Sequence, residues 1–153
     1  MKTSSPTDLV IGFSAECSLV TDLKAGLNDT SEAFAQVKVY VLLDGTAVPV
    51  SSDDTGADSG KVVYCERTFK VKTYFAPGAC ITDALCIELF LKTRDANHFN
   101  WITLNVGSGE HTIEVRGLLT VTASGGGSAQ ALVGKRTLIV SPEKLANDIT
   151  VAP

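Results

Sequence analysis

The residues best suited to acid–base chemistry are two histidines, His98 and His111, the only ones in the chain. His98 ends the polar segment 94–98, where we expect a solvated loop between strands. His111 follows a glycine turn and shares the alternation of a buried strand face, so we expect a hydrogen-bonded histidine at the core edge. Neither histidine can be paired with a particular nucleophile, and no nucleophile elbow, P-loop, dinucleotide or zinc-protease motif is present. We therefore expect no enzymatic activity, and a small hydrolase is the least favoured interpretation.

The chain has four cysteines, and their spacing does not match a metal-binding motif. Cys17 and Cys65 share the apolar alternation of two separate strands, so they could bridge within one core. Cys80 lies in a Pro-Gly turn region, and Cys86 has the alternation opposite to the apolar residues around it. Among the three connectivities we favour Cys17–Cys65 with Cys80–Cys86, and the alternative is four reduced cysteines. Disulfides imply an oxidising compartment or the cytosol of a thermophile.

An acidic segment, 51–60, places Asp53, Asp54 and Asp58 among glycines and serines. Calcium prefers several oxygen ligands from such a loop, but the spacing does not match an EF-hand. These aspartates are weak calcium candidates, and an acidic surface loop is the favoured interpretation. No other cofactor is implied.

Composition indicates one globular domain spanning residues 1–153, with tails at about 1–7 and 147–153. Hydrophobic residues make up 44% of the chain, which argues against disorder. The net charge of -4 and the absence of a basic stripe disfavour nucleic-acid binding. No apolar run is long enough to span a membrane, and the first residues do not form a signal peptide. Either the protein stays where it is made, or this is a mature form whose leader is absent.

The strongest pattern is an apolar residue at every second position, which predicts strands that each bury one face. We expect a short helical turn at 21–28, a tight hairpin at Gly107–Gly109 and a longer, mobile loop at 125–127. The odd positions of 111–123 are expected to form one buried face. Long antiparallel strands of this kind favour a two-sheet β-sandwich, with a jelly roll preferred to an immunoglobulin domain. The predicted strands lie near 8–20, 34–43, 61–75, 84–93, 99–106, 110–123 and 129–140.

Several aromatic residues fall on the opposite alternation and are predicted to point away from the core. Such rings either pack beneath a loop, form a subunit interface or stack on sugar rings. A β-bulge would instead shift the alternation and bring rings inside. The candidate interface or ligand-platform residues are Phe34, Tyr40, Tyr64, Tyr74, Phe90 and Trp101.

The segment Phe99–Trp101, followed by Gly107 to Val115, resembles a recurring hairpin of extracellular β-sandwich modules. In that hairpin an aromatic strand and a glycine turn precede a G-x-H-x-I/V-x-V strand. Jelly-roll domains of the tumour-necrosis-factor/C1q kind and several carbohydrate-binding modules look like this. The resemblance implies an extracellular jelly roll, covers a short part of the chain and transfers no functional residue.

These observations predict a non-catalytic, self-assembling structural protein located outside the cell or on a cell or virion surface. The expected partner is a second copy of the chain, bound through an aromatic face centred on Tyr40, Tyr64 and Tyr74. A second route is donation of a tail strand, from Met1–Thr7 or Asn147–Pro153, to an unpaired sheet edge. The alternative is a carbohydrate-binding module that holds a glycan with Trp101 and tyrosines.

Overall fold

A computed structural model describes residues 1–26, 29–50, 54, 56–73 and 87–144, which form β-strands and no helix. The all-β prediction is therefore confirmed. In chain order the strands are β1 (Lys2–Thr3), β2 (Thr7–Ala25), β3 (Thr30–Leu43), β4 (Thr46–Ala47), β5 (Val62–Lys72), β6 (Ile87–Val106), β7 (Gly109–Glu110), β8 (Ile113–Ser124) and β9 (Ser128–Glu143).

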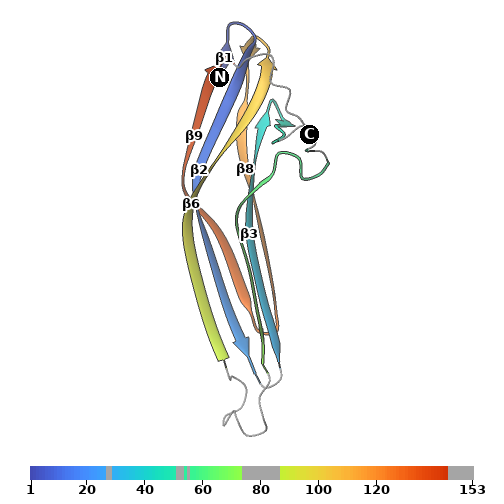
Figure 1. Cartoon of the computed structure of the whole chain (residues 1–153), viewed down its shortest axis with the longest axis vertical. Helices are drawn as coiled ribbons and strands as arrows, with labels where there is room; N and C mark the ends of the chain where they lie inside the picture. The colour runs from blue at the N-terminus through green and yellow to red at the C-terminus, as the bar shows by residue number, and fades with distance from the viewer. Residues whose placement is uncertain (27–28, 51–53, 55, 74–86, 145–153) are drawn as a thin grey trace.

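The strands form three antiparallel sheets (Figure 1). One has the order β6–β2–β9. In the second, β3 lies between β5 and β8, and β4 pairs with the last residues of β3. The third is the short pair β1–β7. The long strands run side by side along an elongated molecule, with β2 and β3 at the centres of the two larger sheets (Figure 1).

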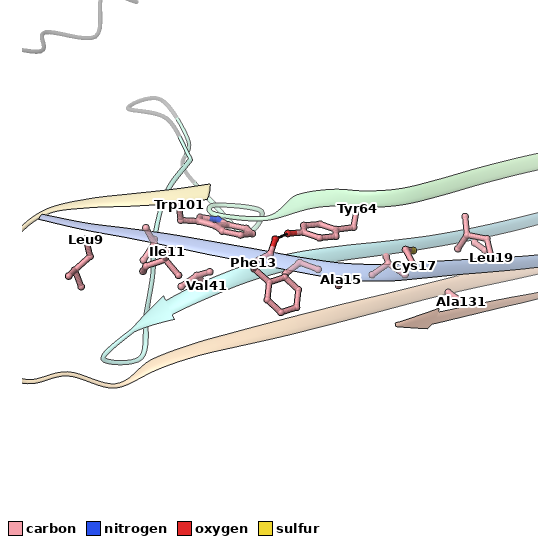
Figure 2. Close-up of a cluster of buried hydrophobic side chains, with 14 of the residues drawn as sticks. Leu9, Ile11, Phe13, Ala15, Cys17, Leu19, Val41, Tyr64, Trp101 and Ala131 are labelled. Carbon is pink, nitrogen blue, oxygen red and sulfur yellow. Dashed lines mark hydrogen bonds between the residues drawn. The ribbon is translucent and has the colours of Figure 1, made fainter. Parts of the chain in front are cut away.

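The core lies between β2 and β3, because both strands bury alternate side chains. Leu9, Ile11 and Phe13 of β2 are buried, as are Val37 and Val39 of β3. Side chains from β5, β6 and β9 join the same hydrophobic cluster (Figure 2). Alternation places successive side chains on opposite faces of a strand, so each of these sheets turns one apolar face toward the other.

The loop predicted at 94–98 is wrong, because β6 continues through it. Arg94 pairs with Ser18 and His98 pairs with Ser14 in an uninterrupted register. The central strand β2 is 19 residues long and offers β6 a continuous partner. Polar side chains are accommodated there because β6 is an edge strand with a solvent-facing side.

Two expected turns also differ from the structure. The segment predicted as a helical turn at 21–28 is part of β2 as far as Ala25, because Thr21–Ala25 pair with β6. The hairpin predicted at Gly107–Gly109 is wrong as well. There the chain crosses from β6 in one sheet to β8 in another, and β7 pairs with β1 between them.

The glycines between β8 and β9 form a tight turn rather than the longer loop expected. The amide of Gly127 donates to the carbonyl of Ser124 at 3.1 Å. Gly125 has a φ of +60°, and a Cβ there would lie 2.1 Å from the carbonyl oxygen of Thr30. Glycine is required at this position because both the backbone conformation and the close approach of β3 exclude a side chain.

Candidate functional site

A disulfide joins Cys17 of β2 to Cys65 of β5, with their Cα atoms 6.3 Å apart. This confirms the pairing predicted from the alternation of the two strands. The other predicted pair, Cys80–Cys86, lies outside the described residues. The bridge connects the two larger sheets through their interior.

The side of the molecule where β5 meets β6 is closed by further links between the two sheets. Trp101 of β6 is 0% exposed, and its indole Nε1–H donates to the carbonyl of Gly60, just before β5, at 2.9 Å. Asn97 Nδ2 donates to the carbonyl of Tyr64 at 2.8 Å. The disulfide and both hydrogen bonds thus lie along this closed side.

Tyr64 points into the core, although its alternation predicted an outward ring (Figure 2). The β3–β5 register shifts between Val37 and Lys38, which leaves Tyr64 as the extra residue of a β-bulge. Its hydroxyl donates to the carbonyl of Phe13 at 2.7 Å. Burial raises the pKa of Tyr64 to about 12, so the hydroxyl stays protonated at neutral pH.

The remaining aromatic candidates do not gather on one face. Phe34 and Tyr40 are half-buried on β3, and the ammonium group of Lys61 lies 6.0 Å from the centre of the Tyr40 ring. Phe90 is exposed on β6, in a different sheet. Tyr74 lies outside the described residues. With Tyr64 and Trp101 in the core, the described members of the predicted aromatic platform do not form a continuous surface.

The opposite side, between β8 and β9, is open. Among the described strands, β8 pairs with β3 alone and β9 pairs with β2 alone, so each has one edge without a described partner. In the part of the chain that the structure describes, no disulfide or hydrogen bond joins these two strands beyond their connecting turn. The two larger sheets are therefore linked at the β5–β6 side and not at the β8–β9 side, within the described residues.

Apolar side chains on the open side face the core but remain in contact with solvent. Leu119 pairs with buried Val37, and Leu138 pairs with buried Phe13, so both point inward. Their exposed fractions are nevertheless 47% and 43%, and that of Val121 is also 47%. The expectation that the odd positions of 111–123 form a buried face is therefore wrong. His111, Ile113 and Val115 are half-buried, and Gly117, Leu119, Val121 and Ala123 are exposed. Among the described strands, none pairs with this edge of β8.

A groove of about 600 Å³ runs between the two edges. We call it the β8–β9 groove, and it is lined by Phe13, Val39, Val115, Arg116, Gly117, Leu119, Val133, Arg136 and Leu138. Arg116 forms an ion pair with Glu114, with Nε and Oε1 2.8 Å apart. Arg136 has no ion-pair partner among the described residues. The groove is therefore mostly apolar and carries one unpaired positive charge.

Sequence reasoning missed this groove, although the sequence contains a signal for it. Leu118–Leu119 and Leu138–Ile139 are consecutive apolar pairs that interrupt the alternation. In a strand such a pair places one apolar side chain on each face. Leu118 and Ile139 are exposed on the outer faces of their sheets. Apolar residues on both faces of an edge strand indicate a surface that another strand can cover.

His98 is part of a hydrogen-bonded row on the outer face of β2 and β6. Its Nε2 lies 2.9 Å from Asn100 Oδ1 and its Nδ1 lies 2.8 Å from Ser14 Oγ. Asn100 Oδ1 accepts from Nε2, and the serine hydroxyl can either donate to Nδ1 or accept from it. A Cβ at Gly12 would lie 2.9 Å from Asn100 Oδ1, so glycine leaves space for the row. The row is exposed, and its residues do not line the β8–β9 groove.

His111 links the β3–β4 turn to the start of β8. Its Nδ1 lies 2.7 Å from Asp44 Oδ2 and its Nε2 lies 2.9 Å from the carbonyl oxygen of Gly107. Both neighbours are acceptors, so both ring nitrogens donate when the ring is protonated, and the protonated form is favoured. The hydrogen bond to Asp44 is the main cause of the raised pKa of His111, as it is of the lowered pKa of Asp44. His111 is thus the hydrogen-bonded histidine that the sequence predicted.

This pair predicts that stability falls as the pH rises above the ordinary histidine pKa of 6.5. A raised pKa in the folded state favours folding while the ring is protonated in both states. That contribution is lost as the pH passes from the unfolded to the folded pKa. Urea unfolding at pH 5.5 and 8.5 should show a loss of stability that is smaller in His111→Gln. An identical pH dependence in both proteins would contradict the role of His111.

The acidic segment does not gather its carboxylates. Asp54 Oδ2 accepts from the amides of Val50 and Gly60 at 2.8 and 2.6 Å. Asp58 forms ion pairs with Lys61 at 3.2 Å and Lys38 at 3.4 Å, and their hydrogen bonds and charges lower its pKa. Asp53 lies outside the described residues. Within the described ranges, no group of three or more acidic, histidine or cysteine residues is placed to hold a metal ion.

No protein-family model, curated protein or solved structure matches this chain. The resemblance of Phe99 to Val115 to extracellular jelly-roll modules therefore has no support beyond those residues. None of the described residues forms a helix long and apolar enough to cross a membrane.

Proposed function

We propose that this protein is a non-catalytic structural module that assembles with copies of itself through the β8–β9 groove. The observation that carries this proposal is the half-exposure of Leu119, Val121 and Leu138 beside two unpaired strand edges. In this proposal the two larger sheets form a β-sandwich that is closed at β5–β6 and open at β8–β9. The jelly-roll arrangement stays a prediction.

Two driving forces favour association at the open side. Full burial of an aliphatic side chain contributes about 1.5–3 kcal/mol, so completing the burial of three half-exposed ones is a substantial gain. Unpaired edge amides and carbonyls can also form a ladder of hydrogen bonds with an added strand. We therefore propose that the self-association interface is the β8–β9 groove and not the aromatic face predicted from the sequence.

A location outside the cell, or on a cell or virion surface, belongs to the same proposal. The Cys17–Cys65 disulfide supports it, because disulfides persist mainly in oxidising compartments. A secreted matrix protein, a filament subunit or a virion component would each use a stable β-module that self-associates through one edge.

The carbohydrate-binding alternative is less well supported. Stacking on a sugar requires an exposed aromatic ring, and Trp101 is fully buried. Phe90 remains available on β6, but Phe34 and Tyr40 lie in the other sheet. A hydrolase stays the least favoured interpretation. The exposed row of Ser14, His98 and Asn100 does not line the β8–β9 groove.

The proposal predicts a concentration-dependent oligomer that Leu119→Lys weakens. A lysine there would place a charge in the apolar groove, close to Arg116 and Arg136, and raise the dissociation constant by on the order of a hundredfold. Leu104→Lys is the matched control, because Leu104 is 61% exposed on β6 and does not line the groove. Light scattering over a range of concentrations measures both variants.

The proposed function is wrong if the wild-type protein remains a monomer at every concentration. It is also wrong if both lysine variants associate as strongly as the wild type. Circular dichroism spectra matching the wild type would show that each variant is folded.

A further inference from the structure

The shape of the β8–β9 groove determines what kind of segment can fill it. It is bordered by two strand edges that no described strand pairs with, and it is lined mainly by apolar side chains. An extended strand satisfies both features, since its backbone can pair with one edge while alternate side chains point inward. This inference rests on the proposed function and concerns the identity of the occupant.

We infer that the groove receives residues 145–153 of a second copy of the chain as a donated β-strand. This segment follows β9 and reads Leu-Ala-Asn-Asp-Ile-Thr-Val-Ala-Pro. Ile149 and Val151 alternate with Thr150, which is the pattern of a strand with one apolar face. Nine extended residues span about 30 Å, whereas Val115 to Leu119 along β8 covers about 13 Å.

Charge complementarity favours segment 145–153 as the occupant of the groove. The competing arrangement is two copies packed groove to groove. Two grooves placed face to face would bring Arg116 and Arg136 of one copy against those of the other, and like charges at an interface disfavour association. Segment 145–153 has no Lys or Arg and carries Asp148. It therefore brings a carboxylate to a groove in which Arg136 has no ion-pair partner among the described residues.

The other candidate donor, Met1–Thr7, is already engaged within its own chain. Lys2 and Thr3 pair with Glu110 and Gly109. The Thr3 hydroxyl donates to the carbonyl of Gly107 at 2.6 Å, and the amide of His111 donates to the carbonyl of Met1 at 2.7 Å. Donation of this tail would require all of these contacts to break.

Geometry favours a second copy over the same chain as the source of the strand. If the segment folded back on its own β9 through a two-residue turn at 145–146, Asn147 would face Lys144 and Pro153 would face Leu138. Arg136 and Val133 would then stay uncovered. A strand from another copy can instead lie along the whole groove. Each copy both gives and receives a strand, so the assembly is a closed ring or an open filament.

The test combines two full-length variants that each lack one half of the contact. Ile149→Asn with Val151→Asn removes the apolar face of the donor, and Leu119→Lys blocks the groove. Each alone should self-associate on the order of a hundredfold more weakly than the wild type. Mixed together, they should form a one-to-one dimer, because the intact segment of the groove variant enters the intact groove of the donor variant. Thr150→Asn with Ala152→Asn, on the opposite face, is the control that should assemble normally.

Each outcome separates this inference from the proposed function. If the donor variant assembles like the wild type while Leu119→Lys does not, the groove is the interface but this segment is not its occupant. If the donor variant is a monomer and the mixture also stays monomeric, donation between copies is wrong. A monomeric wild type overturns both proposals. Leu138→Lys, at another half-exposed residue that lines the groove, replaces Leu119→Lys if the latter does not give the wild-type circular dichroism spectrum.

A synthetic peptide of residues 145–153 provides an independent measurement. By fluorescence anisotropy it should bind the donor variant, whose groove is intact, and bind Leu119→Lys at least tenfold more weakly. Asp148→Asn in the peptide should also weaken binding, because it removes the only charged side chain of the segment, whose sign is opposite to that of the arginines at the groove. Absence of binding to the donor variant would overturn the inference.

Discussion

Replacing Trp101 with alanine is expected to lower the free energy of unfolding by about 3–5 kcal/mol, the range for deleting a large buried aromatic side chain. Trp101 is 0% exposed, and its ring packs edge-on against Phe99 with centroids 4.9 Å apart. The substitution also leaves the carbonyl of Gly60 without its indole donor. Urea unfolding followed by far-UV circular dichroism measures the loss, since the chain has a single tryptophan.

Trp101→Phe serves as the control because it keeps most of the apolar volume and removes only the indole N–H and part of the ring. It should cost about 1–3 kcal/mol, less than the alanine variant. An alanine variant less than 1 kcal/mol below the wild type would contradict the buried position of Trp101.

Replacing both Cys17 and Cys65 with alanine is expected to lower the free energy of unfolding by about 4 kcal/mol. The bridge closes a loop between residues 48 positions apart, and loss of such a loop closure increases the entropy of the unfolded chain. The same bond holds β2 to β5 at the closed side of the molecule. Differential scanning calorimetry or urea unfolding under oxidising conditions measures the loss.

A reductant provides the matched control in a Cys80→Ala, Cys86→Ala background, where only Cys17 and Cys65 remain. Reduction of that variant should reproduce the destabilisation seen in the double alanine variant at Cys17 and Cys65. If reduction leaves its stability unchanged, Cys17 and Cys65 are not bridged in the folded protein.

The alternation of apolar residues was sufficient to predict an all-β chain, most of the strands and the Cys17–Cys65 pair. Alternation is a local property, because each residue of a strand points opposite to the one before it. Once Cys17 and Cys65 were assigned to the apolar faces of two strands, a bridge between those faces became the favoured pairing, and the structure confirms it.

The alternation pattern could not predict features that depend on which strand pairs with which. Residues 94–98 are polar and were predicted as a loop, yet pairing with the long strand β2 keeps them extended. Gly107–Gly109 has the composition of a hairpin, yet β6 and β8 pair in different sheets. Tyr64 was predicted to point outward, and the bulge opposite Val37 and Lys38 turns it into the core.

The sequence by itself determined which faces of the strands are apolar, and hence the all-β fold class, and it favoured the Cys17–Cys65 pairing. Only the tertiary structure decided which edges meet. Leu119 and Trp101 both lie on apolar faces, but Trp101 is covered at the closed side while Leu119 remains half-exposed in the groove. The physical reason is that burial of a side chain depends on strands distant in sequence, whereas its direction depends only on its own strand.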